Sequence, residues 1–194
     1  MNATLLKSIK PVFFSSRDVA LALGISGDSA RLACHRYFEK GLLIRPKRDI
    51  YVLAENWGRL ELAELYALAN RLQVPSYISF LTALSYYEIT TQIQRNFFES
   101  VAVVRTKQVA AVDTIFRYIK IEKKLYFGFT KKDNFFIALP EKAFLDAVYL
   151  MSLGRYRLDV SSLDMGKFNA KELKRLAGLF PTATRRLLEK ICKR

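Results

Sequence analysis

The 194-residue sequence has few of the residues that build disulfide frameworks, metal centres and nucleotide-binding loops. Two cysteines, Cys34 and Cys192, are too few for a disulfide scaffold, and a single histidine, His35, is too little for a zinc site. The eight glycines form neither a dinucleotide-binding pattern nor a phosphate loop. We therefore expect reduced thiols, no metal and no cofactor.

Long apolar runs are also lacking. The most apolar windows, residues 77–87 and 101–104, are shorter than the ~20 residues that cross a bilayer. Residues 1–10 do not combine a basic segment with a long apolar run, as a secretory signal would. The sequence therefore predicts no membrane partner and a cytoplasmic location.

What the sequence has in excess is positive charge. There are 32 Lys and Arg against 18 Asp and Glu, a formal net charge of +14, while 51% of the residues are hydrophobic and 13% aromatic. That apolar content separates the chain from disordered basic tails and predicts folded cores. Residues 155–194 alone have 11 basic and 4 acidic residues, so they carry half of the excess positive charge. A polyanionic partner is expected.

Residues 1–57 have the pattern of a winged helix-turn-helix domain. Ser15 and Ser16 offer N-cap oxygens for a short helix that ends at Gly24. A second helix begins near Ser26 and ends at Gly41. Two helices joined by a tight turn are typical of proteins that place the second helix in the DNA major groove. The second helix has an apolar stripe at helical spacing: Ala30, Ala33, Cys34, Tyr37 and Phe38.

The next segment predicts the wing. Two β-prone runs, residues 42–44 and 50–53, flank a five-residue turn at 45–49 that contains Pro, Asp and three cations. Between Arg31 and Arg48 there are six basic residues and one acid, Glu39. The local charge therefore favours contact with double-stranded DNA, in particular an operator sequence.

Candidate DNA contacts lie opposite the apolar stripe and in the wing. Arginine suits the O6 and N7 atoms of guanine, whereas Ser, His and Lys are expected to make mixed base and phosphate contacts. An ordinary solvated basic helix face is the alternative interpretation. The candidates are Ser16 and Arg17 of the first helix, Ser29, Arg31, Leu32, His35, Arg36 and Lys40 of the second, and Lys47 and Arg48 of the wing.

Residues 58–194 predict a second, α+β domain with a small sheet packed by helices, so the whole chain is expected to be α+β. Its predicted helices are 60–72, 77–87, 141–153, 170–179 and 181–191, and its predicted strands are 100–106, 115–121, 124–129 and 135–139, with a hairpin turn at 131–134. The last two helices are basic and offer candidate secondary phosphate contacts: Lys171, Lys174, Arg175, Arg185, Arg186 and Lys190.

One pattern indicates an enzyme. Asp113, Glu122 and Lys124 are the residue types that hold a divalent metal and activate water in nucleases. An extended chain would separate the two carboxylates by about 30 Å, which favours a purely structural reading of these charges. We expect no catalytic activity, and a metal-dependent nuclease or a non-specific basic nucleic-acid-binding protein are the alternatives to a sequence-specific regulator.

Three segments carry a resemblance to a known family: the run from Ile25 through Gly41 to Val52, residues 76–84, and residues 139–146, which read LPEKAFLD. On these, the chain resembles the AbiEi-type antitoxins and transcriptional regulators of type IV toxin-antitoxin systems. The resemblance implies an N-terminal DNA-binding domain that represses its own operon. It also implies a C-terminal domain that counters a nucleotidyltransferase-type toxin without necessarily binding it. Asp49 stands where the family is expected to have Gly, and Asp tolerates left-handed backbone.

Overall fold

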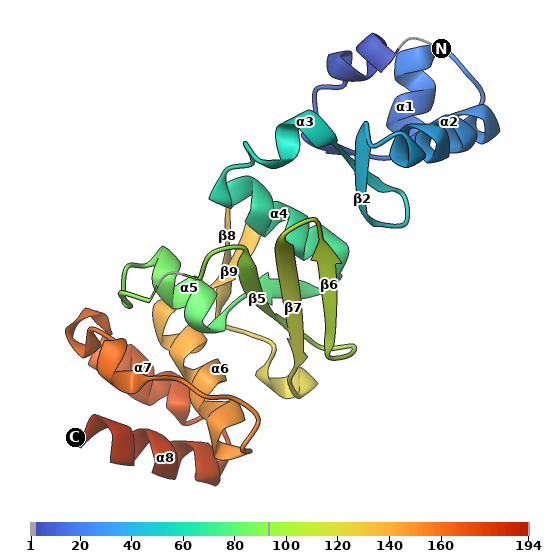
Figure 1. Cartoon of the computed structure of the whole chain (residues 1–194). Coiled ribbons are helices and arrows are strands. Elements are labelled where there is room, and N and C mark those ends of the chain that lie inside the picture. The colour runs from blue at the N-terminus through green and yellow to red at the C-terminus, as the bar shows by residue number, and fades with distance from the viewer. Residues whose placement is uncertain (1–2, 93, 194) are drawn as a thin grey trace.

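The structure is a computed structural model that describes residues 3–92 and 94–193 (Figure 1). Helices and strands are mixed along the chain, so the predicted α+β class is confirmed. The strands form two sheets, one of three strands in the order β1-β3-β2 and one of six in the order β6-β7-β5-β4-β9-β8. The first helices and the last helix lie at opposite ends of the molecule (Figure 1).

Helix signals in the first part of the chain act as predicted. The side chain of Ser15 accepts from the backbone of Asp18, and Gly24 ends the helix with φ +63°. Ser26 caps the next helix, and Gly41 follows it with φ +69°. The elements are η1 (Ala3–Ser8), β1 (Phe13–Phe14), α1 (Ser16–Leu23), α2 (Gly27–Glu39), β2 (Leu43–Lys47), β3 (Ile50–Leu53) and α3 (Ala54–Trp57).

The β2–β3 hairpin has a tighter turn than predicted. Strand β2 continues through Lys47, so Arg48 and Asp49 alone form the turn instead of residues 45–49. Pro46 lies within the strand, where the register is irregular between Ile44 and Lys47, and a strand tolerates a missing N–H at such a place. Asp49 adopts φ +60°, which confirms that Asp accepts the left-handed turn position.

The remaining elements build the large sheet and its helices. They are α4 (Leu62–Leu72), β4 (Ser76–Ile78), α5 (Phe80–Tyr86), β5 (Phe97–Ala102), β6 (Lys107–Ala111), β7 (Thr114–Lys120), η2 (Lys123–Leu125), β8 (Phe129–Lys132), β9 (Phe135–Ala138), α6 (Pro140–Ser152), η3 (Val160–Ser162), η4 (Met165–Lys167), α7 (Ala170–Ala177) and α8 (Thr182–Cys192). Helices α7 and α8 pack on α6, and α6 begins at Pro140 as expected.

Three predictions for the sheet were wrong. Residues 76–78 form a central strand instead of the start of a helix, because β4 pairs antiparallel with β5 and parallel with β9. A short, fully buried apolar run has the same appearance in a strand and in a helix. Residues 123–125 form a 3-10 helix where a strand was expected at 124–129, and the edge strand β6 was missed.

Helices cover both faces of the large sheet. The ring of Tyr66 in α4 packs edge-to-face on the ring of Phe98 in β5, with centroids 5.7 Å apart. The next residue of β5, Glu99, accepts a hydrogen bond from Tyr156, which lies in the segment after α6. Successive strand residues point to opposite faces, so α4 covers one face and the α5–α6 side covers the other.

Buried hydrophobic residues form two clusters. The smaller one runs from Leu6 to Tyr51, and the larger one from Val52 to Leu188. Val52 and Trp57 of the first predicted domain belong to the larger cluster, so the division into 1–57 and 58–194 stays a prediction. Among the residues described, none of the helices has the length and apolar character to cross a membrane.

Candidate nucleic-acid interface

Helix α2 presents a continuous exposed face. Ala30, Ala33, Cys34 and Tyr37 are buried, which turns the opposite side of the helix to solvent. Helical spacing places the exposed candidates side by side on that side. They are Ser29, Arg31, Leu32, His35, Arg36 and Lys40, and we call this set the α2 face.

The charges of the α2 face are only partly neutralised. Arg31 pairs with Asp28 one turn away, and Nδ1 of His35 lies 3.8 Å from Oε1 of Glu39. An exposed ion pair such as Arg31–Asp28 contributes about 0–1 kcal/mol, so a phosphate or a base edge competes with it easily. Leu32 has 58% of its surface exposed, and an apolar side chain at such a position matches the methyl group of thymine.

The two candidates on helix α1 differ in exposure. Arg17 is exposed, and with Arg31 it lines a hollow of about 560 Å³ between α1 and the start of α2. Ser16, in contrast, is buried, and its N–H donates to Oδ1 of Asp49 over 2.8 Å. Ser16 therefore joins the start of α1 to the hairpin turn, and its DNA contact stays a prediction.

The hairpin brings cations toward the second sheet. Lys47 and Arg48 are exposed, as predicted. Strand β2 contacts β6, and burial together with nearby Lys47 and Arg105 lowers the pKa of Lys107. Arg105 is exposed and adds a cation near the hairpin, whereas Lys107 is half-buried and its ammonium group donates to the carbonyl oxygen of Leu72 over 3.2 Å. Sequence reasoning missed them because their proximity to Lys47 depends on strand β6, which was not predicted.

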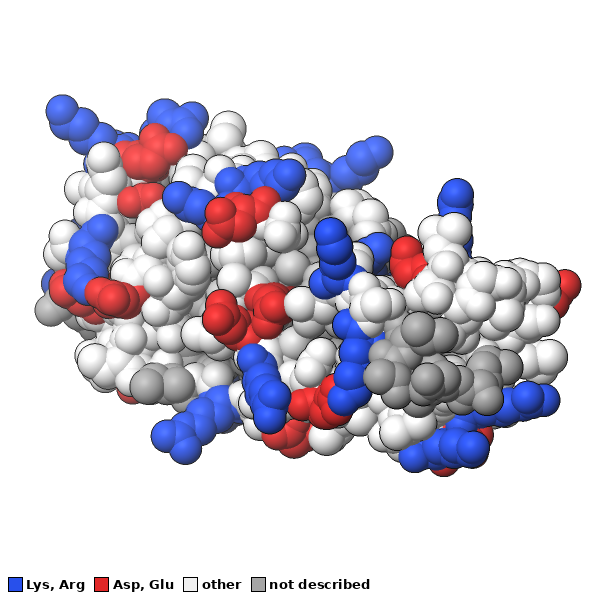
Figure 2. Space-filling model, turned by 90° about the horizontal axis from the view of Figure 1, so that it is seen from above, with Lys and Arg blue, Asp and Glu red and all other residues white. Residues whose placement is uncertain are grey.

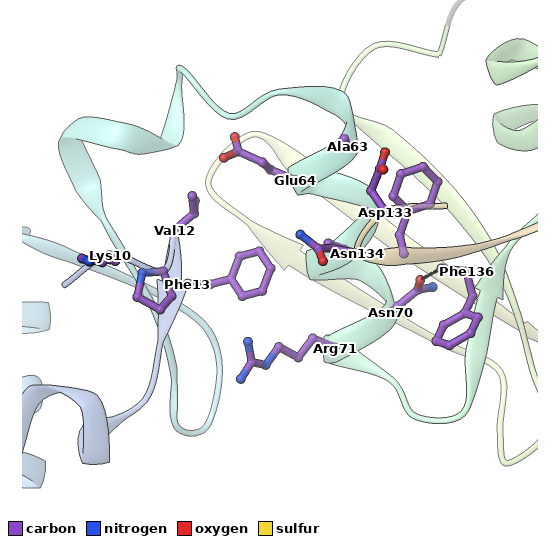
Figure 3. Close-up of a pocket in the computed structure, with 13 residues that line it drawn as sticks. Lys10, Val12, Phe13, Ala63, Glu64, Asn70, Arg71, Asp133, Asn134 and Phe136 are labelled. Carbon is purple, nitrogen blue, oxygen red and sulfur yellow. Dashed lines mark hydrogen bonds between the residues drawn. The ribbon is translucent and has the colours of Figure 1, made fainter. Parts of the chain in front are cut away.

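A pocket of about 650 Å³ lies where the first part of the chain meets the second (Figure 3). Phe13 projects from β1 toward α4, and the guanidinium carbon of Arg71 lies 5.3 Å from the centre of its ring. On the other side of this junction, Nε1 of Trp57 donates to Asp113 over 3.3 Å. These contacts hold α1 and α2 in a defined position relative to the large sheet.

The nuclease candidates are separated by strand β7. Asp113 precedes the strand and accepts from Trp57 and from Nδ2 of Asn96 at 2.7 Å. Glu122 follows the strand, where it pairs with Lys124 at 2.7 Å and accepts from Tyr149 at 3.1 Å. No group of three metal-binding side chains occurs within residues 3–92 and 94–193. The structure therefore does not bring this set together.

The basic residues of the last helices lie far from the α2 face, at the other end of the molecule (Figure 1). All six are exposed: Lys171, Lys174, Arg175, Arg185, Arg186 and Lys190. Arg175 pairs with Glu172 through two hydrogen bonds of 2.6 and 2.7 Å. In the view from above, Lys and Arg spread over both halves of the molecule, with Asp and Glu between many of them (Figure 2).

Comparison with known proteins gives a likeness in fold. Neither the models of known protein families nor the sequences of curated proteins match this chain. A solved structure, the crystal structure of the RV2827C protein from Mycobacterium tuberculosis, has 13% sequence identity and a TM-score of 0.65. The superposition covers 97% of this chain and 73% of that chain. The chain is therefore similar in fold to RV2827C over nearly its whole length.

Proposed function

We propose that the protein is a sequence-specific transcriptional repressor whose N-terminal part is a winged helix-turn-helix domain. In this proposal α2 is the recognition helix and the β2–β3 hairpin is the wing. The observation that carries it is the α2 face, where Arg31, Leu32, His35 and Arg36 stand exposed side by side on one helix. This combination of two guanidinium forks, an imidazole and an apolar side chain suits base edges in the major groove better than a uniform phosphate surface.

We also propose that the protein acts in the cytoplasm as an AbiEi-type antitoxin that represses its own operon and counters a nucleotidyltransferase-type toxin. The support is the resemblance of three segments. Two of them, residues 76–84 and 139–146, supply the buried contacts between Tyr77, Ser79, Lys142 and Asp146. In this proposal the second domain is not an enzyme.

The test is a gel-shift assay with DNA from the promoter of the protein's own operon. Replacing Arg31 and Arg36 by Ala is expected to abolish specific retention, since each good bidentate contact contributes about 1–3 kcal/mol of discrimination. The matched control replaces Arg185 and Arg186 by Ala, which removes the same charge at the opposite end of the molecule. Retention of operator DNA by the Arg31 and Arg36 variant at the strength of the parent protein would show that α2 is not the recognition helix.

Competition with random duplex DNA separates this proposal from general basic binding. A sequence-specific repressor stays on its operator in excess random duplex, whereas a non-specific protein is displaced, because its affinity comes from phosphates alone. Equal competition by the two duplexes would contradict the proposal.

A further inference from the structure

A separate pocket of about 430 Å³ lies on the second domain, on the α5–α6 side of the large sheet. Two of its walls are Glu99 of β5 and Arg117 of β7, which are directly paired in the parallel register of these strands. A third wall is the segment that leaves α6 after Gly154 and includes Arg155, Tyr156 and Arg157. None of these residues takes part in the proposed DNA contacts.

Glu99 is a buried carboxylate whose polar partners are Tyr156, Gln94, Arg117 and the backbone of Leu81. Only 1% of its surface is exposed, and burial raises the pKa of its carboxyl. Its Oε2 accepts from the hydroxyl of Tyr156 at 2.6 Å and from Nε2 of Gln94 at 3.5 Å. Its Oε1 lies 3.8 Å from Nη1 of Arg117, an ion pair longer than a hydrogen bond. Because a buried charge is costly without partners, these contacts are favoured and keep Arg117 and Tyr156 beside the pocket.

The pocket has more positive than negative charge. Arg117, Arg155 and Arg157 line it against the single carboxylate of Glu99, which leaves two positive charges in excess. In the part of the chain that the structure describes, no carboxylate lies within ion-pair distance of Arg155 or Arg157. A guanidinium group binds two oxygens of a phosphate at once, and a phosphate monoester has nearly two negative charges at neutral pH.

The size and the remaining walls indicate a small ligand. A volume near 430 Å³ lies within the range of about 300–1,000 Å³ that small-molecule sites occupy. Leu81 and Phe97 supply an apolar wall on which a ring can lie. We propose that this pocket binds a small molecule of nucleotide size through a phosphate monoester, with the three arginines on the phosphate and Glu99 positioning Arg117. The proposal does not depend on DNA binding by α2.

The test is calorimetric titration of the full chain with adenosine monophosphate, adenosine and inorganic phosphate. Adenosine monophosphate is expected to bind, and adenosine about tenfold more weakly or not at all, since hydrogen bonds to a charged group supply most of the affinity. Replacing Arg117 by Gln is expected to raise the Kd for adenosine monophosphate about tenfold. The matched control is Arg95→Gln, an exposed arginine outside the pocket, which is expected to leave that Kd unchanged.

A double-mutant cycle tests the positioning role of Glu99. Glu99→Gln is expected to weaken binding in the parent protein and to have little further effect when Arg117 is already Gln, because Glu99 acts through that arginine. A structural effect alone would weaken both backgrounds equally and would overturn this role. Circular dichroism and thermal unfolding verify that each variant is folded.

Three results would overturn the binding proposal: no binding of adenosine monophosphate at millimolar concentration, binding of adenosine with equal affinity, or equal weakening by Arg95→Gln. A 5′-phosphorylated tetranucleotide distinguishes a free nucleotide from the end of a nucleic-acid strand. Tighter binding of the tetranucleotide than of the mononucleotide would overturn the small-molecule assignment.

Discussion

Lys142 and Asp146 form an ion pair with no solvent exposure, one turn apart on α6. The ammonium group of Lys142 also donates to the hydroxyl of Tyr77 over 2.7 Å, and Asp146 accepts from Tyr77 at 3.0 Å and from Ser79 at 2.8 Å. Burial lowers the pKa of Lys142 and raises that of Asp146, so each charge depends on the other. The four side chains therefore tie α6 to the centre of the sheet.

Replacing Lys142 by Met is expected to lower the free energy of unfolding by about 3–5 kcal/mol, because Asp146 is left buried without its partner. The double variant Lys142→Met with Asp146→Leu is expected to be more stable than the single variant, since both buried charges are then absent. Urea unfolding measures the free energy of unfolding of both variants.

The matched control is Lys124→Met, which breaks an exposed pair with Glu122 and is expected to change the free energy of unfolding far less, because water screens that pair. If Lys142→Met costs no more than this control, the buried pair does not hold α6 in place.

At the scale of elements, the hairpin turn and the start of α1 depend on each other. Asp49 takes a left-handed conformation, φ +60°, and at the same time its Oδ1 accepts the N–H of Ser16 at 2.8 Å. The first N–H groups of a helix have no partner within the helix, so this bond satisfies one of them from the β2–β3 turn. A single side chain therefore sets the position of the hairpin relative to α1.

Three variants of Asp49 separate its two roles. Asn keeps both the left-handed tolerance and an acceptor, so its unfolding free energy is expected to stay within about 0.5 kcal/mol of the parent. Gly keeps the backbone conformation but has no acceptor and is expected to cost about 1 kcal/mol. Val tolerates the left-handed conformation poorly and has no acceptor, so it is expected to lower the free energy of unfolding by about 2–3 kcal/mol. Urea unfolding gives the order, and a Val variant as stable as the Asn variant would contradict both roles.

The elements also differ in how far the sequence predicts them. Helices α1, α2 and α6 have local start and stop signals, such as Ser15, Gly24 and Pro140, and they were predicted within one or two residues. Strands β4 and β6 have no such signals. Residues 76–78 form a strand because β5 and β9 lie on either side of them, and those partners are distant in the chain.

On the scale of the whole molecule, the candidate nucleic-acid contacts divide between two ends. The α2 face and the hairpin lie at one end, and α7 and α8 lie at the other (Figure 1). Arg185, Arg186 and Lys190 of α8 therefore lie at the opposite end of the molecule from the α2 face. We propose that the C-terminal surface faces a different partner from the operator that α2 contacts.

Salt dependence of operator binding tests this division. Each phosphate contact contributes a slope of about 0.9 in log K against log salt concentration. Replacing Arg185, Arg186 and Lys190 by Gln is expected to leave the slope unchanged, whereas Lys47→Gln with Arg48→Gln is expected to reduce it by about 1.8. A slope reduced by the C-terminal variant would place α8 on the DNA.

For the candidate sites, the sequence predicted the exposed basic helix and failed where the site depends on distant contacts. Arg31, Leu32, His35 and Arg36 follow from the apolar period of a single helix, since a buried stripe defines the exposed side. The burial of Ser16 was not predicted, because its partner Asp49 lies 33 positions away in the hairpin turn. Glu99 and Arg117 went unnoticed because they are 18 positions apart and meet only when β5 and β7 pair.

The positive charge follows from the composition alone. The capped helices and the amphipathic α2 can be derived from the sequence because they arise from residues within a few positions of one another. The strand order, the buried Lys142–Asp146 pair, the contact between Phe13 and Arg71 and the arginine-lined pocket exist only in the folded chain. Those features depend on contacts between distant segments, and the identity of a residue does not specify which distant partner will neutralise its charge or cover its side chain.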